Sequence, residues 1–154
     1  MVLRKDSINS VLEIAKALKE IKDTNLVAEA LLNLGLKTAA SRDVGTGVNQ
    51  IPDMSSFTAS ANSTGWLKLP SGVVIQWGQV GTDPGALVTI PFPIPFPNNL
   101  FQIVGSCLDV NNANIVAINS TDKINLNIVA WVVSQNVVTV TRTQTPVKWI
   151  AIGN

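Results

Sequence analysis

The chain has 154 residues, a net charge of +1 and a hydrophobic content of 46%. Its length fits one domain with an appendage, because ordinary domains run to about 100–200 residues. The near-neutral charge argues against a nucleic-acid partner. The longest apolar run, Ile128 to Val133, is far shorter than the roughly 20 residues that span a bilayer. No apolar signal-peptide segment follows the first charges, so synthesis in a cytoplasm is expected, without membrane insertion.

Residues 1–34 have a helical pattern and carry much of the charge: 13 of the 21 charged side chains fall in residues 1–43. Ser10 followed by Glu13 is typical of a capping box at a helix start. The spacing of the next apolar residues indicates the seam of a short coiled coil, formed by Val11, Ile14, Leu18 and Ile21. The same spacing also fits an amphipathic hairpin packed on its own domain.

A second helix is expected to begin at Thr24 or Asn25 and to end with Gly35 as its cap. Residues 35–64 are small and polar and lack a sustained period, which indicates an irregular shaft or linker. The Gly45-Thr46-Gly47 stretch is a very weak candidate for a phosphate loop, since no Gly-Lys-Ser/Thr sequence follows it.

Residues 65–154 change to a two-residue period rich in β-branched side chains, which predicts an antiparallel β-sandwich or barrel-like sheet. Pro70 and Gly72 predict a three-residue hairpin with a bulge. This hairpin places Trp66 and Trp77 on adjacent strands. The predicted strands are 65–69, 72–80, 86–92, 100–109, 114–119, 123–134, 136–143 and 147–152.

Prolines alternate with apolar residues in Pro91-Phe-Pro-Ile-Pro-Phe-Pro97. Because proline has no backbone N–H, this segment is expected to be an edge strand or a polyproline II ribbon. Phe92, Ile94 and Phe96 then form one apolar row. Several later strands are apolar on both faces, so either the N-terminal helices or identical subunits should cover the second face.

The available side chains exclude most hydrolytic chemistry. The chain has no histidine, so Ser-His-Asp and Cys-His mechanisms are excluded, and the commonest zinc ligand is missing. Asp83, Asp109 and Asp122 lie beside turn residues and are expected to cap their own turns rather than to act as catalytic pairs. Cys107 is interpreted as a small buried hydrophobe. We therefore expect no enzyme, catalytic residue, metal or cofactor.

Neutral hydrogen-bonding side chains gather in what the sequence suggests are neighbouring loops, and such a surface with an exposed aromatic ring suits a carbohydrate. Asparagine and serine also populate turns for purely local reasons, which is the alternative. Trp77 is in phase with Val73 and Ile75 and is expected to face the core, whereas Trp66 should be partly exposed. The candidate receptor-binding residues are Asn111, Asn112, Asn114, Ser120, Thr121, Asp122 and Trp66.

Three stretches resemble the C-terminal tip domain of bacteriophage tail-fibre proteins. They are GWLKLPSGVVIQWGQV from Gly65, VTIPFPIPFPNNLFQIVGS from Val88, and the final VKWIAIGN. Upstream, LGLKTAASRDVGTGVNQIPDMSSF from Leu34 is similar to a repeat element of fibre shafts. Family members usually end in an aromatic residue after Ile-Gly, where this chain has Asn154.

The resemblance implies an intertwined homotrimer in the virion whose tip adheres to bacterial lipopolysaccharide or an outer-membrane protein. The domains would be a trimerising helical stalk (1–34), a shaft segment (35–64) and a β-sandwich tip (65–154), joined to the rest of the fibre. Two alternatives remain: a structural tail component without receptor contact, and a polysaccharide-cleaving tailspike that uses aspartates. Because the chain enters a helix so close to Met1, its start is expected to be the cut edge of a fragment.

Overall fold

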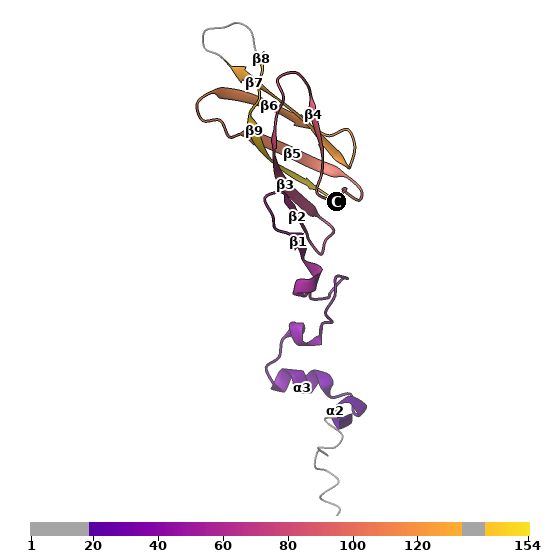
Figure 1. The fold of residues 1–154 in the computed structure, drawn as a ribbon. Helices are drawn as coiled ribbons and strands as arrows, with labels where there is room; N and C mark the ends of the chain where they lie inside the picture. Colours follow the sequence, from indigo (N-terminus) through magenta and orange to yellow (C-terminus); the bar gives the residue numbers. More distant parts are fainter. Residues whose placement is uncertain (1–18, 134–140) are drawn as a thin grey trace, which may run out of the picture. The chain divides into compact units, whose positions relative to one another are not determined.

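The computed structural model describes residues 19–133 and 141–154, which form two units that divide after Ile51. The first unit contains helices α2 (Lys19–Asp23) and α3 (Val27–Asn33) and the 3₁₀ helix η2 (Thr38–Ser41) (Figure 1). Within the described ranges, no helix is long and apolar enough to cross a bilayer.

Both α-helices end in a residue with left-handed backbone. Asn25 follows α2 with φ 59°, and its N–H donates to the Lys22 carbonyl at 3.1 Å. Gly35 follows α3 with φ 68°, and its N–H donates to the Leu32 carbonyl at 2.9 Å. These are the bonds of Schellman caps. The predicted Gly35 cap is confirmed, but Asn25 ends the first helix instead of starting the second.

A compact loop at 43–51 explains the two glycines that resemble a phosphate loop. The Gln50 side chain folds back into this loop, and its Oε1 accepts a hydrogen bond from the Gly47 N–H at 2.7 Å. A Cβ on Gly45 would lie 2.2 Å from Gln50 Oε1, so a larger residue there would displace the Gln50 amide from the loop. The Gly-Thr-Gly stretch therefore serves the local packing of the loop.

The second unit is a two-sheet antiparallel sandwich, as the sequence predicts (Figure 1). One sheet has the strand order β1-β2-β3-β9-β5, and the other has the order β4-β7-β6 with β8 paired to β7. The elements are η3 (Met54–Ser56), β1 (Thr58–Ser60), β2 (Gly65–Lys68), β3 (Val74–Gly81), β4 (Val88–Pro91), β5 (Leu100–Cys107), β6 (Ala113–Asn119), β7 (Asn125–Val133), β8 (Thr141–Arg142) and β9 (Pro146–Gly153).

The strand predictions agree with these bounds to within a few residues, and two differences stand out. Residues 58–60, in the segment expected to be irregular, form β1 and pair with β2. Of the predicted strand 136–143, residues 141–142 form β8, whereas 134–140 lie outside the described residues.

The core lies between the sheets and is closed by the proline-rich ribbon. Trp149 of β9 is 3% exposed and meets the ring of Phe92 edge-on, with centroids 5.8 Å apart. Phe92 in turn meets Phe96 edge-on at 5.0 Å. The buried cluster consists of Val74, Phe92, Phe96, Leu126, Ile128, Val147, Trp149 and Ala151.

The hairpin between β2 and β3 has the predicted turn, but the predicted side-chain phase is wrong. The Gly72 N–H donates to the Leu69 carbonyl, and Gly72 has φ 87°, as the bulged hairpin requires. The residues of β3 that face the core are Val74, Gln76 and Gly78. Trp77 lies on the opposite face and is only half-buried.

The two tryptophans lie on opposite faces of their sheet. Trp77 pairs with Gly65, which leaves room for the indole, and its Nε1–H donates to the Asn62 carbonyl at 2.9 Å. Trp66 pairs with Gln76 and is half-buried on the core side. The sequence indicates the wrong phase because residues 73–75 are all apolar and the polar Gln76 is typical of an outward face.

The proline-rich segment is an edge, as predicted. Pro91 ends β4, which forms an edge of the four-stranded sheet. Prolines remove every second donor, and each N–H that remains from 92 to 96 donates a hydrogen bond. Phe92 and Phe96 donate to carbonyls of the β6–β7 turn at 2.8 and 2.9 Å, and Ile94 donates to Gln76 Oε1 at 3.0 Å.

Candidate functional site

The candidate receptor-binding residues fall into three separate places. The structure puts Asn111 and Asn112 just before β6 and Asn114 within it, whereas Ser120 to Asp122 follow its other end. Since β6 has seven residues at about 3.3 Å each, roughly 20 Å separates the two turns. Trp66 belongs to the other sheet. The expected cluster in neighbouring loops is therefore wrong, because a strand lies between the loops.

The turn before β6 is organised around Asp109. Its carboxylate accepts hydrogen bonds from the Asn111 N–H at 2.9 Å and from the amides of Asn112 and Asn114 at 2.8 and 3.3 Å. These bonds, with that from Asn112 first, hold the pKa of Asp109 below its ordinary value of 3.8. The amide groups of Asn112 and Asn114 are thus used within the turn.

The turn after β6 is organised in the same way around Asp122. Its carboxylate accepts hydrogen bonds from the N–H groups of Asn125 at 2.6 Å and Ile124 at 2.7 Å, and from the Asn125 amide. The Asn125 backbone bond contributes most to lowering the pKa of Asp122. Asp83 similarly accepts from the Gly85 N–H at 2.6 Å. The prediction that these aspartates serve their own turns is confirmed.

The two lowered pKa values predict a loss of stability in acid. Folding favours the ionised carboxylates of Asp109 and Asp122, so their contribution is full above the unfolded pKa and is lost as pH falls through the folded values. We expect the melting temperature to fall on acidification to about pH 3. The fall should be smaller in the double variant Asp109→Asn, Asp122→Asn; an equal fall, measured by circular dichroism, would contradict the assignment.

The predicted helical seam is only partly within the described residues. Val11, Ile14 and Leu18 lie outside them, and Ile21 is half-buried in α2. Cys107 is half-buried, and burial raises the pKa of its thiol, as expected for a residue used in packing. Within residues 19–133 and 141–154, no group of three potential metal ligands occurs.

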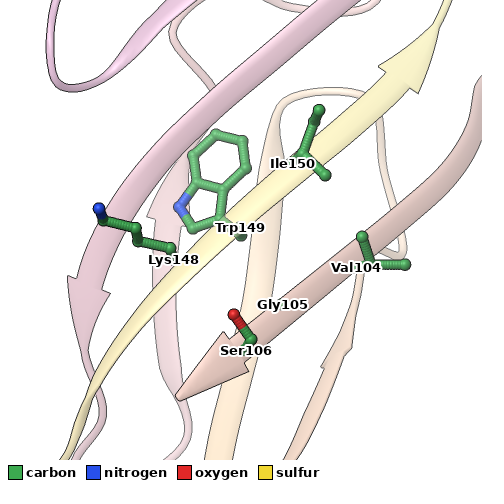
Figure 2. Close-up of a pocket in the computed structure, with 6 residues that line it drawn as sticks. All are labelled: Val104, Gly105, Ser106, Lys148, Trp149 and Ile150. Carbon is green, nitrogen blue, oxygen red and sulfur yellow. The ribbon is translucent and has the colours of Figure 1, made fainter. Parts of the chain in front are cut away.

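The outer face of the five-stranded sheet is apolar and, among the residues that the structure describes, partly exposed. Cross-strand pairing places Trp77, Ile150 and Val104 in one row, and Leu67, Ile75 and Ile152 in the next. Ile150 and Val104 are 42% and 49% exposed. We call these six residues the outer apolar face. A hollow of about 280 Å³ lies beside this row on the neighbouring strands β9 and β5 (Figure 2).

The outer face of the four-stranded sheet has a different chemistry. A hollow of about 390 Å³ there mixes aliphatic, amide and hydroxyl side chains, and we call it the amide hollow. Of the residues that line it, only Thr121 is among the candidate receptor-binding residues predicted from the sequence, because Ala117 and Asn127 look ordinary until β6 and β7 are paired. The hollow is lined by Leu87, Ala117, Ile118, Asn119, Thr121, Asn127 and Val129.

The sandwich, with short helices before it, has the fold of a tail-fibre C-terminal domain. An N-truncated R2-type pyocin tail fibre matches over 68% of this chain and 38% of its own, with a TM-score of 0.52 and 22% identity. The P. aeruginosa R2 pyocin fibre matches over 83% and 29%, with a TM-score of 0.52 and 21% identity. The chain thus spans well under half the length of these fibres, and the likeness concerns the fold.

The family follows from the sequence match. Residues 68–154 match the family described as tail fiber protein gp53-like, C-terminal, and the chain belongs to this family. The protein therefore carries the C-terminal domain of a tail-fibre protein. A comparison with curated protein sequences finds no match.

Proposed function

We propose that this chain forms the trimeric, receptor-binding tip of a tail fibre and adheres to lipopolysaccharide or an outer-membrane protein of a bacterium. Membership of the tail-fibre C-terminal family carries the proposal. The protein would act in the virion without catalysis, because the aspartates of its β unit are engaged in separate turns. The trimer would be joined to the rest of the fibre through residues 1–64.

The outer apolar face supports association with identical copies. Its six side chains are branched or aromatic, and an apolar area of this kind on a sheet normally has a partner. The first unit adds exposed apolar side chains in and directly after α3, including Leu32 at 75% and Leu34 at 72%. A seam along residues 1–34 and a buried outer apolar face would together hold three chains.

Receptor contact is proposed for the two turns that flank β6, where Asn111, Asn112 and Thr121 are exposed. Each turn is held rigidly by an aspartate, and a rigid turn loses little entropy on binding. One observation favours the alternative, a structural tail component: the Asn112 and Asn114 amides already donate to Asp109. Adhesion experiments separate these two functions.

The test compares the wild-type chain with Ile150→Asp, which puts a charge in the outer apolar face, and with Val48→Asp at a site that is 92% exposed and lies outside both the outer apolar face and the turns that flank β6. We expect wild type and Val48→Asp to be trimers by light scattering and to bind at least one strain in a panel of bacteria. Ile150→Asp should be a folded monomer that adheres about 10²–10⁴-fold more weakly, since avidity is lost.

Two results would overturn parts of this proposal. A stable wild-type monomer at micromolar concentration would contradict the trimer. Binding of labelled wild type to none of a broad strain panel would favour the structural component. Where adhesion occurs, strains stripped of surface glycan identify the receptor class: lost binding indicates a glycan, and retained binding a protein.

A further inference from the structure

The amide hollow has two chemically distinct rows on the outer face of the four-stranded sheet. Asn127 of β7 pairs with Thr89 of β4 on one side and with Asn119 of β6 on the other. The next row pairs Val129 with Ala117. Successive residues on one face of a strand are about 7 Å apart, so an aliphatic strip runs beside a polar strip at about that distance.

The polar strip has free donors in a defined direction. Thr89 Oγ1 donates to Asn127 Oδ1 at 2.7 Å, which fixes the orientation of that amide. The Asn127 Nδ2 group must then point away from Thr89, toward β6. Asn119 is exposed, and its side chain makes no hydrogen bond to the described residues. Two amides that can donate and accept thus border one hollow.

The aliphatic strip is shaped by one small residue. Ala117 is exposed on the same face as Ile115 and Asn119, and its small methyl group leaves space for the hollow above the sheet. Val129 is 6% exposed, and Leu87 stands at the rim with 52% exposed. No ionised side chain lines the hollow, so it has no partner for a charged ligand.

We propose that the amide hollow binds a neutral N-acetylated sugar, such as an N-acetylhexosamine residue of a surface glycan. An acetamido group carries a methyl beside a carbonyl and an N–H. The methyl fits the aliphatic strip of Leu87, Ala117 and Val129, and the amide atoms fit Asn127 and Asn119. The volume of about 390 Å³ is in the range of small-ligand sites. This inference rests on the proposed adhesive function and names its ligand class.

The probe is N-acetyl-D-glucosamine, titrated into ¹⁵N-labelled full-length chain and followed by amide chemical shifts. One small polar sugar should bind with a dissociation constant of about 1 mM at ordinary ligand efficiency. We expect saturable shifts at residues 117, 119 and 127, with D-glucose, which lacks the acetamido group, and D-glucosamine, which is charged, binding several-fold more weakly.

Ala117→Leu fills the hollow and should weaken binding of the sugar at least about tenfold. Ala113→Leu is the matched control, because Ala113 is exposed on the same face of the same strand, four residues away. It should bind like wild type. Asn119→Ala should weaken binding of the sugar. The melting temperature of this variant should stay unchanged, since the Asn119 side chain is exposed.

The proposal is overturned if no shifts occur at about 50 mM sugar, if Ala113→Leu and Ala117→Leu behave alike, or if Ala117→Leu changes the oligomeric mass, which would place another copy in the hollow. Cell adhesion separates this failure from that of the proposed function. If Ala117→Leu adheres to cells as well as wild type does, the hollow is not the sugar-binding site, and the proposed adhesive function still holds. Absence of wild-type adhesion rejects that function, whereas the sugar titration still decides the hollow.

Discussion

Phe96→Ala is expected to lower the free energy of unfolding by about 3–5 kcal/mol. The ring is 1% exposed and meets Phe92 edge-on. It also lies against Gly153, where a Cβ would come within 2.5 Å of the ring. Removal of the ring leaves a cavity in the part of the core that the proline-rich ribbon closes, and the ribbon lacks the donors to repair its contacts elsewhere.

Denaturant titration at fixed protein concentration measures this change, because assembly makes stability depend on concentration. Val110→Ala truncates an apolar side chain that is 93% exposed and should change stability by less than about 0.5 kcal/mol. If the two variants lost similar stability, the ribbon would not be part of the core.

Gln76→Leu should lower the free energy of unfolding by about 2–5 kcal/mol, since it leaves the part-buried N–H and carbonyl groups of Ile94 without partners. Gln76 is fully buried; its Nε2 donates to the Ile94 carbonyl at 2.9 Å, and its Oε1 accepts from the Ile94 N–H at 3.0 Å. The Gln76 side chain thus makes the two hydrogen bonds that a neighbouring strand would make with Ile94, because the prolines prevent a strand from pairing there. Leucine preserves much of the volume but neither hydrogen bond.

The matched control is Gln79→Leu on the same strand, where the side chain is exposed. Its stability should stay within about 0.5 kcal/mol of wild type. Equal melting temperatures for Gln76→Leu and wild type would mean that the ribbon finds other partners, which would contradict the account of its edge.

Local features of the sequence predicted those parts of the fold that depend on near neighbours. The Gly72 turn, the Gly35 cap and the turn roles of Asp109 and Asp122 each depend on residues within five positions. The edge position of the proline-rich segment followed because a missing N–H excludes a central strand whatever surrounds it. These predictions needed no knowledge of how the strands pair.

The phase of β3 and the candidate site could not be predicted in the same way. Gln76 looks like an outward residue until Ile94 is brought against it from 18 positions away. In the sequence, the asparagines near β6 look like one cluster, but the extended strand between them keeps the two turns apart. Asn127 and Ala117 acquire a common site only through the pairing of β6 and β7.

By itself, the sequence determined the two-region composition, the all-β character of residues 65–154, the turns and the absence of histidine chemistry, since these follow from residue types and short-range geometry. The tertiary structure decided which face of each strand is buried, which polar side chains are used internally and where a hollow remains. Those properties depend on pairs distant in sequence, and a strand with apolar residues in both phases has no preferred face until its partners arrive.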